Sequence, residues 1–236
     1  MGLEPFVLAI ETASETCSVG VFAGENLVAI QEIFLPQMHA KMLTTLIQSV
    51  MDVISLPYSQ LSAVAISAGP GSYTGLRIGT STAKGICFAH SIPLIQIPTL
   101  TGIAWQVSPI ANLFPECKIG ILLDARRMEV YAHFFSKEIV PQTPKPQPVI
   151  INQATIQHWN ASSPTILAGS GVAKIQPLIK ANANLLLLPP INCSARSWGK
   201  PIFQAWQQQD FVDLDTFEPE YLKPVMPTIE KPKLPS

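Results

Sequence analysis

Residues 69–79, which read GPGSYTGLRIG, constrain the fold of this chain more than any other stretch. The segment before them, 63–68, is short, apolar and partly β-branched, as expected of a buried strand. Thr74 is placed to cap a helix over residues 75–90. A strand, a glycine turn and a helix amino terminus together can receive an anion on free backbone N–H groups. The spacing nevertheless fits neither the Walker loop, which needs a lysine after Gly75, nor the dinucleotide fingerprint G-x-G-x-x-G.

The predicted helix 75–90 carries a row of small side chains four residues apart. The row consists of Gly75, Gly79, Ala83 and Cys87. Glycine inside a helix costs about 1 kcal/mol relative to alanine, so close approach of another chain segment should offset the cost. Two interpretations stay open: the row packs tightly against the chain's own sheet, or it contacts another subunit.

The predicted elements occur in the same order twice along the chain. In the first half we expect strands at 6–10, 17–22, 27–34, 63–68 and 94–97 and helices at 38–54 and 75–90. In the second half we expect strands at 119–123, 130–135, 149–151, 165–168 and 185–188 and helices at 154–159 and 172–180. Two βββαβα units predict an α/β chain with a duplicated ribonuclease-H-like fold, the fold of actin, Hsp70 and sugar kinases.

The two halves are expected to divide at residue 98. Residues 1–98 would form the first half, joined by the tail 209–236, and residues 99–208 the second. Ser194 is placed to cap a last helix reaching Gln208, with Pro201 kinking it or delaying its start.

Composition and charge limit the function classes. Only 13% of the 236 residues are charged, about half the usual share, which fits either a large core or a surface that meets a partner. The net charge is −1, and a protein that binds RNA by itself normally has a basic face. We therefore expect contact with tRNA only through a complex.

No credible signal peptide or membrane span is predicted, and the four separated cysteines are expected to be reduced, so the expected compartment is the cytoplasm.

Residues 69–85, GPGSYTGLRIGTSTAKG, resemble the signature of the TsaB family, the dimerisation subunit of the bacterial machinery that makes threonylcarbamoyladenosine in tRNA. Other segments agree in order: VLAIETASETCSVGV near the start, His39 opening a helix, LLDARRMEVYA at 122–132 and FEPEYLKP at 217–224. The resemblance implies a scaffold without catalysis that supports TsaD, the subunit that transfers threonylcarbamoyl to N6 of adenosine 37 in tRNAs reading codons that begin with A. It implies TsaD as heterodimer partner, TsaE in a ternary complex, and a homodimer of this chain as a further state.

The same resemblance implies that the first two long helices, 38–54 and 75–90, form the partner surface. The residues assigned to this surface are His39, Met42, Leu43, Leu46, Gly75, Arg77, Ile78, Gly79, Thr82 and Ala83. Arg77 is expected to contact a carboxylate or phosphate of the partner, with a surface ion pair as the alternative. Gly79→Leu is then expected to block the complex and to leave the monomer folded.

Proteins of the actin type hold nucleotide phosphates with one hairpin from each half. The corresponding hairpin residues here are Glu11, Thr12 and Asp124, and Gly169 and Gly171 would form the turn that holds the adenosine. Glu11 either positions a metal or water, or simply ends a strand before the hydroxyl-rich turn 12–16. Arg126 stands where a phosphate hairpin needs glycine, which predicts a degenerate site. We expect no intrinsic cofactor and nucleotide only in the complex with TsaD. An active ATPase or kinase of the same fold, which would bind ATP tightly by itself, is the alternative.

Catalytic groups are not evident in the sequence. The related TsaD binds metal through an H-x-x-x-H helix, but here Leu43 stands four residues after His39, and a lone histidine cannot anchor a catalytic ion. Ser72 lies in G-S-Y rather than in G-x-S-x-G. We therefore expect no catalytic residue and no metal site, which argues against a zinc peptidase.

Overall fold

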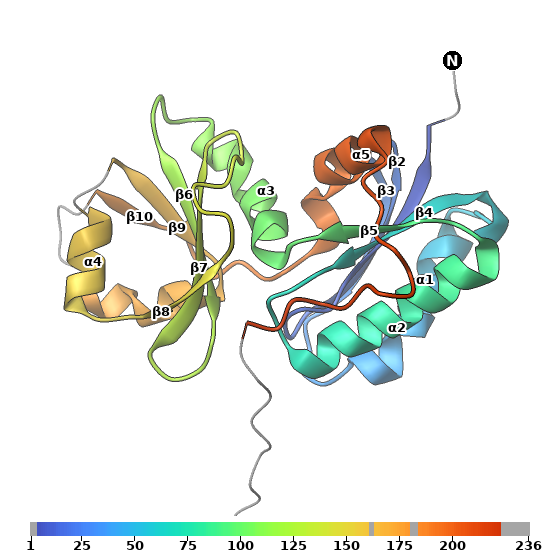
Figure 1. The fold of residues 1–236 in the computed structure, drawn as a ribbon, viewed down its shortest axis with the longest axis horizontal. Coiled ribbons are helices and arrows are strands. Elements are labelled where there is room, and N and C mark those ends of the chain that lie inside the picture. Colours follow the sequence, from blue (N-terminus) through green and yellow to red (C-terminus); the bar gives the residue numbers. More distant parts are fainter. Residues whose placement is uncertain (1–3, 161–162, 180–183, 223–236) are drawn as a thin grey trace, which may run out of the picture.

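The computed structural model describes residues 4–160, 163–179 and 184–222, and these form two lobes, each built around a five-stranded sheet (Figure 1). The elements of the first lobe are β1 (Phe6–Glu11), β2 (Cys17–Ala23), β3 (Asn26–Ile33), α1 (His39–Val53), η1 (Tyr58–Gln60), β4 (Leu61–Ser67), α2 (Tyr73–His90) and β5 (Leu94–Ile97). Its strand order is β3-β2-β1-β4-β5. The strand β1 runs antiparallel to β2 and parallel to β4, and β5 continues the parallel part.

The second lobe repeats this topology. Its elements are α3 (Thr99–Ala111), β6 (Lys118–Asp124), β7 (Glu129–Ser136), β8 (Gln147–Ile150), α4 (Gln153–Asn160), β9 (Thr165–Ala168), η2 (Ser170–Lys174), η3 (Gln176–Leu178) and β10 (Leu185–Leu187). The strand order β10-β9-β6-β7-β8 is that of the first sheet read in reverse. The predicted duplicated ribonuclease-H-like fold is therefore confirmed.

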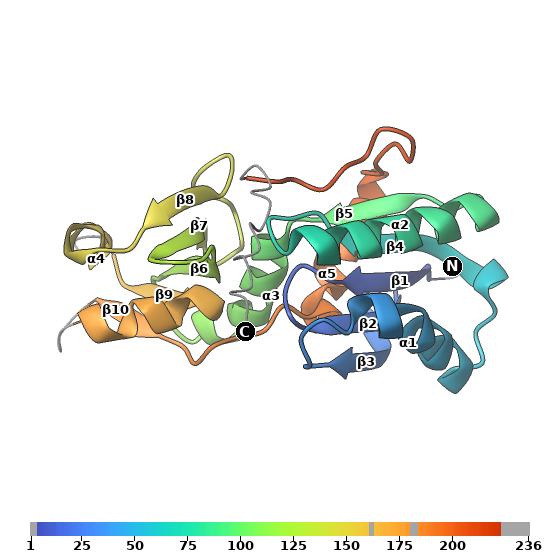
Figure 2. The same cartoon turned by 90° about the horizontal axis from the view of Figure 1, so that it is seen from below.

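Layers of helix cover both faces of the first sheet. The strands β1 and β4 are buried on both faces, which explains their continuous apolar sequences. One face packs against α1 and α2, which lie side by side in Figure 2. The other face packs against the carboxyl-terminal helix α5 (Gly199–Gln208) and the preceding turn η4 (Ala195–Ser197).

The position of α5 corrects the expected division of the chain. Residues up to 208 were assigned to the second half, but Trp198 and Ile202 are buried against Val7 and Ala9 of the first sheet. Ser194 caps only the short turn η4, through a bond from the Arg196 N–H. The helix begins later because Pro201 has no N–H and fits only within the first turn of a helix.

Two other predicted elements differ in detail. The side chain of Ser72, not Thr74, caps α2, by accepting a hydrogen bond from the Gly75 N–H at 3.2 Å. The helix expected at 172–180 is replaced by the two 3-10 turns η2 and η3, because Pro177 lacks the N–H that an α-helix would need there. Residue 180 lies outside the described residues.

The tail, as far as it is described, returns to the first lobe. Val212 bridges to Leu94, Phe217 is buried in the core beneath α1 and α2, and the Glu220 N–H donates to the Ala68 carbonyl at 2.8 Å. A Cβ on Gly69, whose φ is 93°, would lie only 2.5 Å from the Glu220 carbonyl oxygen. Glycine is therefore required at the start of the GPGS turn because the tail packs directly on it. The remaining tail, 223–236, lies outside the described residues.

Candidate partner-binding face

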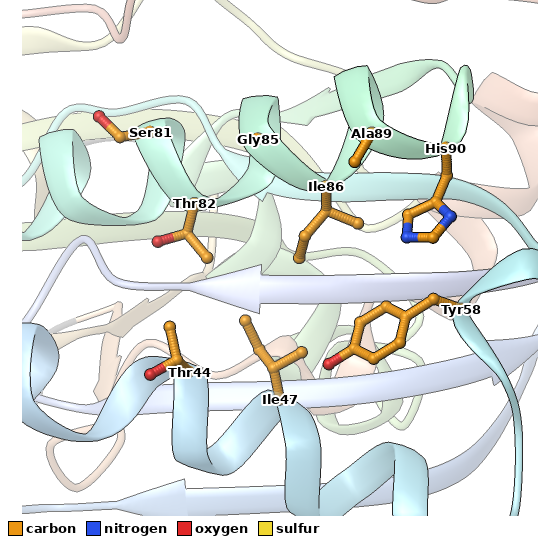
Figure 3. A pocket seen from close by; sticks show the side chains of 9 residues that line it. All are labelled: Thr44, Ile47, Tyr58, Ser81, Thr82, Gly85, Ile86, Ala89 and His90. Carbon is orange, nitrogen blue, oxygen red and sulfur yellow. The ribbon is translucent and has the colours of Figure 1, made fainter.

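A groove of about 410 Å³ lies on the outer surface of the first lobe, between α1 and α2; we refer to it as the α1–α2 groove. Its lining residues are Thr44, Ile47, Tyr58, Ser81, Thr82, Gly85, Ile86, Ala89 and His90. Figure 3 shows Ile47 of α1 and Ile86 of α2 pointing toward each other across the groove, with Tyr58 and His90 at one end. The rings of Tyr58 and His90 are stacked, with centroids 5.7 Å apart.

The chemistry of this groove suits a protein surface better than a charged ligand. Apolar atoms of Ile47 and Ile86 line it, hydroxyl groups of threonine and serine stand along it, and no carboxylate or ammonium group lines it. At Gly85 an added Cβ would have no atom within 4 Å, so the backbone of α2 is open to solvent there. A mixture of aliphatic, hydroxyl and glycine surface permits close approach of another backbone.

The small-residue row of α2 faces the opposite way, into the lobe. Gly75, Gly79, Ala83 and Cys87 are all buried. A Cβ on Gly75 would lie 2.2 Å from the Thr12 carbonyl oxygen, and a Cβ on Gly79 would lie 2.2 Å from Thr12 Oγ1. The row therefore packs on the turn after β1. The prediction that Gly75, Gly79 and Ala83 meet a partner is wrong for the folded chain.

Three predicted interface residues of α1 are also internal. Leu43 and Leu46 are buried in the core between α1 and the first sheet. His39 is buried as well, and its Nε2 lies 3.1 Å from the Thr16 carbonyl oxygen, so it ties the start of α1 to the turn before β2. His39 was expected to face a partner or solvent, and its burial corrects that expectation.

The other four predicted interface residues reach the surface. Met42, Ile78 and Thr82 are half-buried and Arg77 is exposed. The Arg77 guanidinium donates to the Tyr73 hydroxyl at 2.6 Å and lies over the Tyr73 ring, 5.0 Å from its centroid. Arg77 forms no ion pair with any of the described residues, and its contact with a partner stays a prediction.

Sequence reasoning missed most of the groove, although one signal was available. Ser81, Gly85 and Ala89 are small and four residues apart, like the buried row, and they lie on the outward side of the same helix. The residues that α1 and Tyr58 contribute to the groove are brought there by tertiary packing, which cannot be predicted from a local sequence pattern.

Glu11 and Thr12, the first pair of the predicted nucleotide residues, are enclosed in the first lobe. Glu11 is only 1% exposed, and its Oε1 accepts a hydrogen bond from the Ala13 N–H at 2.5 Å. The Thr12 N–H donates to Ser67 Oγ at 3.2 Å. This geometry matches the interpretation of Glu11 as a strand end that stabilises the following turn. Burial raises the pKa of the Glu11 carboxyl to about 7, against the opposing effect of the Ala13 hydrogen bond.

The raised pKa of Glu11 predicts a pH-dependent stability. Since the ordinary value is 4.5 and the folded value about 7, the folded chain binds this proton more tightly, and the resulting stability is lost as the pH rises from about 4.5 to about 7. The loss should be about 3 kcal/mol in the free energy of unfolding. Urea unfolding at roughly pH 5 and pH 8 measures it, and Glu11→Gln should remove this part of the dependence. Identical pH profiles for the two proteins would contradict the assignment.

The second group of predicted nucleotide residues lies together in the second lobe. The Asp124 N–H donates to Ser170 Oγ at 3.0 Å, between Gly169 and Gly171. A Cβ on either glycine would collide with the Leu122 carbonyl oxygen, at 2.4 Å for Gly169 and 3.0 Å for Gly171. Internal packing therefore explains both glycines.

The Asp124 carboxylate is already engaged. Its Oδ1 accepts from Lys174 Nζ at 2.8 Å and from the Arg126 N–H at 2.7 Å. Within the described part of the chain no group of three histidine, cysteine, aspartate or glutamate side chains could hold a metal ion. None of the described helices has the length and apolar character needed to cross a membrane.

Known proteins similar to this chain act in the synthesis of threonylcarbamoyladenosine in tRNA. The family model for tRNA N6-adenosine threonylcarbamoyltransferase, TsaD, matches residues 34–143. The tRNA threonylcarbamoyladenosine biosynthesis protein TsaB of Haemophilus influenzae is 32% identical over 125 residues, which cover 53% of this chain and 51% of that protein. TsaB of Escherichia coli is 30% identical over 128 residues, which cover 53% and 52%. The chain thus spans about half the length of the curated relatives that it matches.

Among solved structures, YeaZ from Pseudomonas aeruginosa has the same fold. It superposes with a TM-score of 0.78 at 22% identity, over 92% of this chain and all of that chain. The likeness extends across both lobes.

Proposed function

We propose that this chain belongs to the TsaB/YeaZ family and is a non-catalytic subunit of the machinery that makes threonylcarbamoyladenosine in tRNA. It pairs with a TsaD-type transferase and supports the transfer of threonylcarbamoyl to N6 of adenosine 37 in tRNAs that read codons beginning with A. TsaE joins the pair, and tRNA is held by the assembly. Two copies of this chain pair through the same face when the partner is missing.

The observation that carries the proposal is the α1–α2 groove. It offers aliphatic and hydroxyl surface and an open glycine backbone without a charged lining, which suits docking of another helical surface. Met42, Ile78 and Thr82 reach the surface on the same two helices and would extend the contact. Packing of α1 and α2 against two helices of the partner would make a four-helix contact.

The absence of intrinsic catalysis is supported by the groups at the former nucleotide positions. Glu11 is buried, and Asp124 is paired with Lys174 and carries a bulky arginine two residues later. A hairpin with arginine at its tip cannot bring its backbone as close to a terminal phosphate as a hairpin with glycine at its tip can. We therefore assign the chemistry to TsaD, with nucleotide bound only in the assembled complex.

A reconstitution experiment tests this function. Unmodified tRNA, ATP, threonine, bicarbonate, an enzyme that supplies the threonylcarbamoyl donor, TsaD and TsaE are incubated with and without this chain, and modified nucleoside is measured by mass spectrometry. Modification is expected only when the chain is present, and the chain alone should transfer nothing. Equal modification in its absence, or transfer by the chain alone, would overturn the proposal.

A further inference from the structure

The turn between β6 and β7 holds two adjacent arginines in a backbone conformation that side-chain-bearing residues rarely adopt. Arg126 has a φ of 70° and Arg127 a φ of 48°. Glycine or asparagine would occupy this left-handed region with less strain. Local strain of this kind persists only where the surrounding structure imposes it, and it is concentrated at functional sites.

Tertiary contacts impose the conformation here. The side chain of Lys174, largely buried, donates to Asp124 Oδ1 and to the Glu129 carbonyl, each at 2.8 Å, and so connects the two ends of the turn. The Arg126 N–H donates to the same aspartate oxygen, and the Glu129 N–H donates to the Arg126 carbonyl at 3.1 Å. Asp124, the carboxylate at the start of the turn, is thus paired with Lys174.

The tip of this turn faces solvent. Arg126, Arg127 and Met128 are consecutive and all exposed. In the described ranges neither of these guanidinium groups forms an ion pair. Figure 1 shows the turn as the loop at the lower end of β6 and β7, in the lobe that does not contain α1 and α2.

We propose that the tip 126–128 is an RNA contact, in which the two guanidinium groups bind phosphates and the tip stacks on an unpaired base. Guanidinium binds phosphate with two parallel hydrogen bonds and stacks on the plane of a base, which an ammonium group does less well. Exposed Met128 adds apolar surface beside them. The inference rests on the proposed function in naming tRNA as the RNA.

This direct contact departs from the sequence-based expectation that the chain meets tRNA only through a complex. With a net charge of −1, the chain itself should bind tRNA weakly and with strong salt dependence. The contact therefore increases the affinity of the assembled complex for tRNA. It lies on the lobe that does not carry the α1–α2 groove, so RNA and partner protein could bind at the same time.

The test is a titration of fluorescently labelled, unmodified tRNA with the full chain, in which binding is measured by fluorescence anisotropy. The salt concentration is about 50 mM and above, where non-specific dissociation constants of roughly 10–100 µM are measurable. The double variant Arg126→Gly/Arg127→Gly removes both charges and suits the positive φ values, so its melting temperature should not fall. We expect its affinity to drop about tenfold and the slope of log K against log salt to shrink by about 1.5. Lys200→Gln removes one positive charge from the exposed face of α5, away from the tip, and should change the tRNA affinity little.

Unchanged tRNA affinity of the double glycine variant would overturn the inference, as would failure of the wild-type chain to bind tRNA. If the variant instead loses co-purification with TsaD while tRNA affinity stays the same, the tip binds an acidic protein segment and the inference is wrong. Failure of wild-type pairing with TsaD would contradict the proposed function alone, because the tRNA titration needs no partner.

Discussion

Gly79→Leu is expected to abolish folding of the chain, which corrects the sequence-based expectation that this variant stays folded and only loses its partner. The first added carbon would lie 2.2 Å from Thr12 Oγ1 and 3.0 Å from Ile66 Cδ1, and both neighbours belong to the buried layer between α2 and the sheet. Thr12 cannot move away easily, because its backbone is fixed between β1 and the turn that follows. Overpacking usually costs about 1–3 kcal/mol, and a branched side chain at so close a contact should cost more than about 4 kcal/mol. Circular dichroism and urea unfolding measure the loss.

Gly85→Leu is the matched control on the same helix. Nothing lies within 4 Å of a Cβ at Gly85, so the substitution should keep the fold and gain up to about 1 kcal/mol from helix propensity. A folded, cooperative Gly79→Leu protein would show that the row of small residues is not the internal contact described here.

The second large effect is on pairing. Gly85→Leu should place four carbon atoms in the α1–α2 groove, where Gly85 now leaves the helix backbone open. We expect at least about a hundredfold loss of affinity for TsaD, since blocking the centre of a well-packed interface costs several kcal/mol. Sedimentation velocity or calorimetry with purified TsaD measures this loss.

Gln204→Leu is the control for the pairing experiment. It adds the same side chain to the exposed surface of α5, on the opposite face of the first sheet, and should leave pairing intact. Undiminished affinity of the Gly85→Leu chain for TsaD would place the partner elsewhere on the molecule.

The sheets could be predicted from the sequence because their signals are local. Short apolar runs at regular intervals mark the strands, and the order βββαβ is the same in both halves, although 3-10 turns replace the next α-helix in the second half. The return of α5 and of the tail to the first lobe could not be predicted, since Trp198 and Phe217 find their buried positions only through neighbours far away in the sequence.

The partner-binding face could be predicted only in part, for a different reason. Periodicity shows that Gly75 and Gly79 share one side of α2, but it does not show whether a sheet or a partner covers that side. Gly79 and Gly85 are the same residue in the same helix, yet one touches Thr12 and the other touches nothing. The family resemblance places His39, Leu43 and Leu46 on the partner surface, but a resemblance that assigns a whole helix to an interface does not show which of its residues face the core.

Amide hydrogen exchange of the chain with and without TsaD tests the central claim most directly, because it reports on every described helix in one experiment. The account predicts that TsaD slows exchange in α1 and in the second half of α2, around Gly85, and leaves α4 and α5 unchanged. Slower exchange at the turns around Glu11 and Asp124, with none at the α1–α2 groove, would contradict it.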